Sequence, residues 1–381
     1  MAKKAVRRKK LRFLQEGKLD ITFLSFILVI LTVGLVMLYS ASYAYSHEYY
    51  GNSYKFISKQ LLFAVAGVVL MLGISKVNYH YWRKCSWLIF GISIALLVVL
   101  LILPPMVSGM DVKRWFVVGP VNFQPSEVAK FAVILLFSSL ISANHDKMKN
   151  WRFILFLVGI LGLTCVLVVL EPHLSATILI FVIGIVLLIV GGIPKLWIIA
   201  GAGAGAGLGA LAIFSGLISY GSDRIKYWLD PWLDPSNKGY QTIQSLLAIG
   251  SGGILGRGIG QSRQKYLWVP EPHNDFIFAI VCEELGLIGA MVIIILFALL
   301  MWRGFTIAMR APDKFGSLMA VGLTFQVGLQ AMLNIWVVTN TIPNTGIGLP
   351  FFSYGGSSLI LLLAQMGIIL SISRAASLQK Q

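Results

Sequence analysis

The sequence predicts an all-α polytopic membrane protein, built as a bundle of ten transmembrane helices. Of its 381 residues, 57% are hydrophobic and only 12% are charged, and the mean hydropathy is +0.82. The apolar residues also occur in runs of about twenty, the length that a helix needs to cross the hydrocarbon core of a bilayer. This pattern excludes a soluble protein of two or three domains.

Polar breaks between the apolar runs delimit the predicted spans. They fall near residues 21–40, 58–75, 86–104, 126–143, 153–170, 174–192, 196–219, 275–302, 315–338 and 357–373. The first run is too long for the core of a signal peptide, so we expect it to remain as an anchor. In the seventh, glycines alternate with mostly alanine from Gly201 to Gly209. Such small residues favour close helix packing.

The basic residues give the predicted orientation. With a cytoplasmic N-terminus, most of the 31 Lys and Arg residues lie on the cytoplasmic side, and six of the others lie in one long loop that the positive-inside rule discounts. We therefore expect both termini in the cytoplasm. The predicted parts are a basic tail (1–20), seven spans (21–219), a large extracytoplasmic loop (220–274), three spans (275–373) and a second tail (374–381). The net charge of +16 thus indicates membrane orientation, not nucleic-acid binding.

The fourth predicted span contains a pair of opposite charges, which are costly in a membrane and therefore candidates for function. Glu127 and Lys130 lie three residues apart on one helix face, after Pro125 at the first helical position. One interpretation is a local ion pair. The other is a cation held for an anionic ligand. We favour the second because Arg114 lies just before the span, and basic groups beside a helix N-terminus suit phosphate.

Three ionisable side chains, Glu271, His273 and Asp275, precede or begin the eighth predicted span. Asp275 is placed to cap the helix or to act as a general base, its pKa set by burial, the helix dipole and a nearby lysine. His273 is expected in a supporting role. Glu283 and Glu284 lie about 12 to 14 Å further along the helix, where we expect hydrogen-bonding anchors between helices.

Glycine and hydroxyl residues precede the tenth predicted span. Ser353, Gly355, Gly356 and Ser357 form either a tight turn with a helix cap or a phosphate cradle of backbone N–H groups. In the predicted orientation spans four, eight and ten all begin at the outer face, so their N-terminal amides would line one external cavity. The glycine-rich stretches at 250–253 and 256–260 follow no strand, which argues against ATP or dinucleotide binding.

Together these segments resemble the SEDS family (shape, elongation, division and sporulation), and its FtsW and SpoVE type more than its RodA type. The resemblance covers almost the whole chain and rests on three long strings. They are KRWFVVGPVNFQPSEVAK from Lys113 to Lys130, the stretch from Tyr227 to Gly289 with VPEPHNDFIFAI, and LPFFSYGGSS from Leu349 to Ser358. Two places depart from the usual sequence of the family. Glu171-Pro172-His173 stands where family members commonly have QPD, and Asn274 stands where they usually have Thr.

The resemblance implies a peptidoglycan glycosyltransferase that polymerises lipid II into glycan strands at the outer face of the bacterial cytoplasmic membrane, during cell division or sporulation. An acceptor hydroxyl would attack the donor's anomeric carbon with inversion, and undecaprenyl pyrophosphate would leave. By matching the family motif, Asp275 is the base and Lys130 orients it. Arg114 and the helix ends are our candidates for binding the pyrophosphate. The sequence leaves open whether a divalent cation, Mg²⁺ or Mn²⁺, shares that work.

The resemblance also implies a partner, a class B penicillin-binding protein that supplies the transpeptidase, together with other division proteins at the septum. We expect its membrane helix beside spans eight and nine, where Gly322 and Gly328 permit close approach. Two alternatives belong to other classes: a lipid II flippase or other transporter, and a non-enzymatic scaffold of the division machinery. The sequence lacks the paired interrupted helices that transporters use, which disfavours transport.

Overall fold

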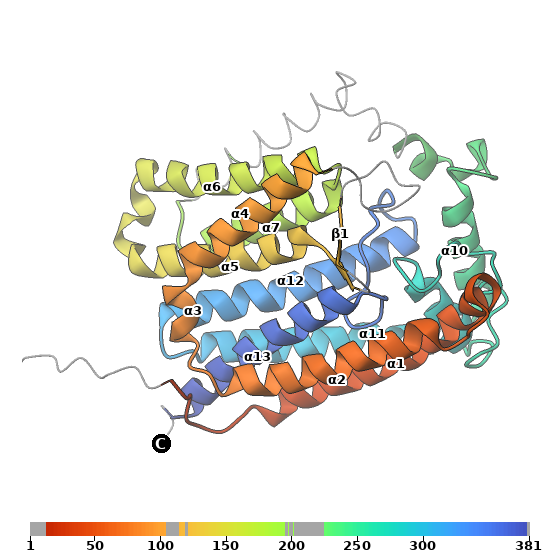
Figure 1. The fold of residues 1–381 in the computed structure, drawn as a ribbon, viewed down its shortest axis with the longest axis horizontal. Helices are drawn as coiled ribbons and strands as arrows, with labels where there is room; N and C mark the ends of the chain where they lie inside the picture. Colours follow the sequence, from red (N-terminus) through yellow and green to blue (C-terminus); the bar gives the residue numbers. More distant parts are fainter. Residues whose placement is uncertain are drawn as a thin grey trace, which may run out of the picture.

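The computed structural model describes residues 13–103, 114–118, 121–194, 197, 201 and 225–378, and it is mostly helical (Figure 1). Seven helices are long and apolar enough to cross a membrane, as expected of a multi-pass membrane protein. They are α1 (Ile21–Tyr50), α2 (Lys55–Ser75), α5 (Pro125–Ala143), α6 (Trp151–Leu170), α11 (Ile277–Met309), α12 (Lys314–Val338) and α13 (Gly356–Leu378). Two shorter apolar helices are α4 (Ser86–Ile102) and α7 (Leu174–Val190). These helices correspond to nine of the predicted spans. The seventh, near 196–219, lies outside the described residues, apart from 197 and 201.

The centre of the bundle contains α5, α12 and α13. At least 67% of the apolar stretch of each is buried, against at most 39% for α1, α2, α6 and α11. Helices α4 to α7 form one group and α1, α2, α11 and α13 another, and α12 contacts both (Figure 1). The outer helices therefore turn apolar side chains outward, as a lipid-facing surface requires.

Several short elements were not predicted. Strands β1 (Phe116–Val118) and β2 (Val121–Phe123) form an antiparallel hairpin that leads directly into α5. Helix α10 (Tyr240–Gly252) lies within the predicted outer loop. Three very short helices are α3 (His80–Lys84) and the 3₁₀ helices η1 (His145–Lys149) and η2 (Pro231–Leu233). The hairpin positions the N-terminus of α5, where Pro125 begins the helix.

Helix α11 is broken at Gly286. This residue has φ +66° and ψ −169°, a conformation that is essentially restricted to glycine. Backbone hydrogen bonds join residues 253–258, in the loop between α10 and α11, to residues 283–288 of α11 across the break. The eighth predicted span, 275–302, therefore differs from the structure, since α11 runs on to Met309 and is interrupted by the loop.

Replacing Gly286 with alanine should destabilise the protein by about 1–3 kcal/mol, because the new Cβ forces a strained backbone. That Cβ would also lie 2.2 Å from the amide nitrogen of Gly256. Gly250→Ala is the matched control, since a Cβ there meets nothing within 4 Å and alanine favours the helix. Thermal unfolding in detergent measures both. Equal midpoints for Gly286→Ala and the parent would contradict the prediction.

Glu283 and Glu284, both almost fully buried, hold the loop between α10 and α11 against α11. The carboxylate of Glu284 accepts hydrogen bonds from the Ser40 hydroxyl of α1 at 2.6 Å and from Lys265 Nζ at 3.0 Å. Glu283 accepts from the Arg263 amide at 2.9 Å. The prediction of an interhelical anchor is confirmed for Glu284, and the loop is a further partner of both residues.

Candidate functional site

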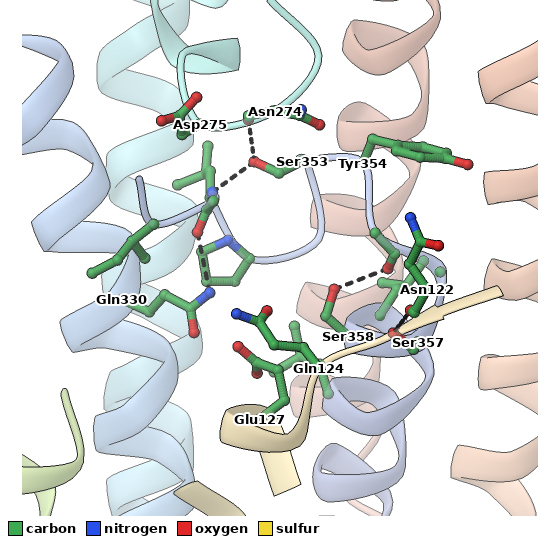
Figure 2. A pocket seen from close by; sticks show the side chains of 18 of the residues that line it. Asn122, Gln124, Glu127, Asn274, Asp275, Gln330, Ser353, Tyr354, Ser357 and Ser358 are labelled. Carbon is green, nitrogen blue, oxygen red and sulfur yellow. Dashed lines mark hydrogen bonds between the residues drawn. The ribbon is translucent and has the colours of Figure 1, made fainter. Parts of the chain in front are cut away.

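A cavity of about 520 Å³ lies where the N-termini of α5 and α13 meet the turn before α11. Its lining includes every residue that the sequence predicted for the site. They are Arg114, Glu127, Lys130, Glu271, His273, Asp275, Ser353, Gly355, Gly356 and Ser357. Figure 2 shows labelled residues from four stretches of chain around this one space. The structure thus brings the predicted residues together.

On the α5 side, Lys130 is held inside the cavity wall with 1% exposure. Its Nζ lies 2.7 Å from Glu127 Oε1 and 3.3 Å from Gln330 Oε1 of α12. The local ion pair that the sequence left open is therefore formed. Because the same ammonium also lines the cavity, the ion pair does not exclude contact with a ligand. The pairing of Lys130 with Asp275 stays a prediction.

Asp275 lies in the turn before α11 and is half-buried. The N-cap position of α11 is occupied by Phe276, so Asp275 lies one residue before the cap. Asn334 Nδ2 of α12 donates a hydrogen bond to the Asp275 carbonyl at 2.6 Å. The Asp275 carboxylate lies close to Gly346, because a Cβ atom built on that glycine would be 3.8 Å from Asp275 Oδ2. The main chain thus fixes Asp275 at the cavity edge, where it lies beside Asn274 (Figure 2).

A polar stripe on α12 was not predicted. Gln326, Gln330 and Asn334 are spaced four residues apart and therefore share one helix face. Gln330 Nε2 donates to the Gly348 carbonyl at 3.1 Å, and Asn334 holds the turn of Asp275. The spacing of three amide side chains within an apolar span was the signal in the sequence. Gln326 and Gln330 line the cavity, and Asn334 holds the turn of Asp275 beside it.

The turn before α13 ties the cavity together. The Ser353 hydroxyl donates to the Asn274 carbonyl at 2.6 Å, and the Gly355 amide donates to Gln60 Oε1 of α2 at 3.2 Å. The Ser357 hydroxyl donates to the Asn122 carbonyl at 2.5 Å (Figure 2). Of the backbone N–H groups in the phosphate-cradle interpretation, the Gly355 amide is thus taken up by a protein acceptor, as a tight turn requires.

The divergent turn at Glu171-Pro172-His173 lies beside the cavity. The Arg114 guanidinium donates a hydrogen bond to the Pro172 carbonyl. His173 Nδ1, in the cavity lining, lies 3.3 Å from the Ser126 hydroxyl. Glu171 is 1% exposed, and its carboxylate has no hydrogen-bond partner among the described residues. Burial raises the pKa of Glu171 to about 8, although the nearby Arg114 opposes that shift. Glu171 is therefore mostly protonated at neutral pH.

The raised pKa of Glu171 predicts a pH-dependent stability. A carboxyl group that is protonated in the folded state stabilises the fold at low pH, and this contribution is lost as the pH rises from its unfolded pKa to its folded pKa of about 8. The loss is at most about 1.4 kcal/mol per pH unit. Glu171→Gln should remove this dependence. Thermal midpoints at pH 6 and pH 9 test it, and parallel curves for both proteins would contradict it.

Comparison with known proteins identifies the family. The sequence profile of the FtsW, RodA and SpoVE cell cycle proteins matches residues 21–378. The chain belongs to this family. Stage V sporulation protein E of Bacillus subtilis is 41% identical to it over 362 residues, which cover 93% of this chain and 97% of the relative. The probable peptidoglycan glycosyltransferase FtsW of Geobacter sp. (strain M18) is 36% identical, covering 93% and 96%.

Solved structures of this FtsW, RodA and SpoVE family share the fold. One chain aligns with a TM-score of 0.79 and 28% identity, covering 94% of this chain and 98% of that chain. Its structure is described as the structural coordination of polymerization and crosslinking by a peptidoglycan synthase complex. The rod shape determining protein RodA of Thermus thermophilus aligns with a TM-score of 0.69 and 26% identity, covering 93% and 97%. The family resemblance predicted from the sequence is confirmed.

Proposed function

We propose that this chain is a peptidoglycan glycosyltransferase that polymerises lipid II into glycan strands. The observation that carries the proposal is the cavity that Asp275, Lys130 and Arg114 line together. The chain is also 36% identical, over 93% of its length, to a probable peptidoglycan glycosyltransferase. A carboxylate and cations in one concave site are the groups that this reaction needs.

In the proposed reaction Asp275 accepts the proton of the acceptor sugar hydroxyl. The hydroxyl oxygen then forms a bond to the donor's anomeric carbon, and the bond from that carbon to the pyrophosphate oxygen breaks with inversion. Lys130 has three N–H donors, of which Glu127 and Gln330 take two among the described residues. The third is available to the leaving pyrophosphate. Arg114 and the N-terminal amides of α5 add positive potential at the same edge.

The sequence left a divalent cation open, and the described residues offer limited support for one. Glu271 and Asp275 line the cavity, and carboxylates are ligands that Mg²⁺ takes. The described part of the chain, however, contains no group of three or more His, Cys, Asp or Glu side chains placed to hold a metal. These residues do not fit a metal held by protein ligands alone. The steps proposed above are assigned to side chains and backbone amides of the chain itself.

We further propose ten spans, with both termini in the cytoplasm and the cavity open to the outer face of the bacterial cytoplasmic membrane, at the division septum. The seven candidate spans and two shorter apolar helices support a multi-pass bundle. The distribution of Lys and Arg supports the orientation. In this arrangement Asp275 lies where a lipid anchored in the membrane presents its sugars.

Purified protein in detergent, incubated with lipid II, tests the proposed activity. Glycan strands separated by gel electrophoresis are expected from the wild type. A flippase needs a membrane with two sides and a scaffold needs its partners, so neither would lengthen strands in this assay. If the folded protein produces no strands under conditions that support an FtsW polymerase, the proposed function is wrong.

We also propose a class B penicillin-binding protein as partner, since a structural neighbour comes from a peptidoglycan synthase complex. The predicted use of Gly322 and Gly328 for that partner was wrong. A Cβ at Gly322 would lie 2.6 Å from Ile134 of α5, and one at Gly328 would lie 2.1 Å from Met301 of α11, so both glycines serve packing within the chain. An outward apolar stripe on α11 remains available. It includes Leu287, Ile288, Met291, Val292 and Ile295.

Binding of the cognate partner should increase turnover. A partner raises activity only if it binds the productive shape of the cavity better than other shapes. Strand synthesis is compared at equal enzyme concentration, with and without the penicillin-binding protein, after co-elution confirms the complex. Equal rates would mean that the partner does not activate the polymerase.

A further inference from the structure

Four aromatic side chains form one wall of the cavity. They are Tyr45 of α1, Phe56 of α2, and His273 and Tyr354 from the two turns before α11 and α13, and we call them the aromatic recess. The ring centroids of Phe56 and His273 are 4.2 Å apart, those of Tyr45 and His273 are 5.0 Å apart, and those of Phe56 and Tyr354 are 4.9 Å apart. Tyr45 and Tyr354 are only half-buried, so ring surface remains open to the cavity.

His273 carries a polar atom that its surroundings do not satisfy. The side chain is 3% exposed, and Nδ1 is buried without a hydrogen-bond partner among the described residues. Burial lowers the pKa of His273 to about 4, so the ring is neutral at physiological pH and offers one donor and one acceptor nitrogen. A buried polar atom without a partner costs free energy. A polar group of a ligand that reaches Nδ1 on entering the recess would remove that cost.

The recess is rigidly connected to the proposed base. His273 and Asp275 belong to the same turn, two residues apart. The Tyr354 amide donates to the His273 carbonyl at 2.9 Å, and the Ser353 hydroxyl donates to the Asn274 carbonyl at 2.6 Å. In Figure 2 Asn274, Asp275 and Tyr354 lie along one edge of the cavity, whereas Gln124 and Glu127 lie across from them. The aromatic wall is therefore on the Asp275 side, and Lys130, which is paired with Glu127, is on the opposite side.

We propose that the aromatic recess binds the acceptor sugar, an N-acetylated hexose, with a ring face against Tyr45 or Tyr354 and a hydroxyl or amide group at His273 Nδ1. This rests on the proposed glycosyltransferase function. A hexose has an apolar C–H face and a polar rim, which matches aromatic rings that carry a polar handle. The donor's pyrophosphate belongs with Lys130 and Arg114. The acceptor therefore occupies the other edge, where its hydroxyl reaches Asp275.

A binding experiment tests the recess without turnover. The probe is the soluble disaccharide of N-acetylglucosamine and N-acetylmuramic acid, titrated onto the purified full chain by saturation-transfer NMR. His273→Phe keeps an aromatic ring and removes Nδ1, and it should weaken binding about tenfold. Tyr45→Leu should also weaken it. Tyr43→Ala is the matched control, because Tyr43 lies on the same helix, is 42% exposed and does not line the cavity. It should bind normally.

Unchanged binding by folded His273→Phe and Tyr45→Leu, or an equal loss in Tyr43→Ala, would overturn the recess. Size-exclusion profiles and thermal midpoints confirm folding.

Kinetic measurements then show whether the recess holds the acceptor sugar or the donor sugar. With a donor-only lipid II that lacks the acceptor hydroxyl, His273→Phe should raise the acceptor KM about tenfold and change the donor KM less than twofold. The reverse would place the donor in the recess and refute the proposal. If the wild type does not polymerise lipid II, the proposed function is wrong. The disaccharide titration would still show whether the aromatic recess binds the sugar.

Discussion

Replacing Asp275 with asparagine should abolish lipid II polymerisation in a protein that remains folded. The amide has nearly the same size but cannot accept the proton of the attacking hydroxyl. The hydrogen bond from Asn334 goes to the main-chain carbonyl of Asp275, so the turn keeps its main attachment. Loss of a general base typically reduces the rate by about 10² to 10⁴. Strand formation from lipid II by the purified variant measures the effect.

Asp230→Asn is the matched control for Asp275→Asn. Asp230 is an exposed aspartate of the outer loop, outside the cavity lining, whose carboxylate accepts a hydrogen bond from the Trp232 amide. It should polymerise at the wild-type rate. Wild-type activity in a folded Asp275→Asn protein would end the assignment of Asp275 as the base, whatever the control shows.

Replacing Lys130 with methionine should lower activity about 10² to 10³-fold, as expected for loss of a donor aimed at developing negative charge. The variant should also unfold at a lower temperature. Removing one partner of a buried ion pair leaves the other charge uncompensated, at a cost of about 3–5 kcal/mol for full burial. Glu127 is 18% exposed, against 2% for the Lys130 side chain, so the cost should be at the low end.

The double variant Lys130→Met, Glu127→Gln separates the two roles of Lys130. It removes both charges, so thermal stability should recover. Activity should not recover if the ammonium contacts the pyrophosphate. A double variant that regains both stability and polymerisation would show that Lys130 serves only the ion pair with Glu127.

The spans and the principal site residues were predictable because their signals are local. Runs of about twenty apolar residues mark each helix, and charges such as Lys130 stand out in an apolar segment. The break at Gly286 was not predictable, because its cause is pairing with residues 253–258 of the loop. For the same reason the sequence left both the tight turn and the phosphate cradle open for Ser353 to Ser357. The acceptor that occupies the Gly355 amide is Gln60, nearly 300 residues away.

The aromatic recess shows the same limit. Phe56 and His273 come from segments more than 200 residues apart, and no periodicity in either segment indicates that their rings touch. The polar stripe of Gln326, Gln330 and Asn334 is different, because its spacing of four is visible in the sequence. A search for amide side chains at helical spacing would have found Gln326 and Gln330, which line the cavity, and Asn334, which holds the turn of Asp275.

The break at Gly286 gives α11 two mechanically distinct parts. Residues 277–285 form a short segment that has the turn of Asp275 at its N-terminal end. At its C-terminal end, the carboxylates of Glu283 and Glu284 and backbone hydrogen bonds attach it to the loop between α10 and α11. Residues 287–309 are long enough to cross a membrane alone. The same loop is also bonded to the start of the longer part, through the amides of Leu287 and Ile288. A movement of the loop would therefore act on the segment that carries Asp275, the proposed base, and on the first residues beyond the break.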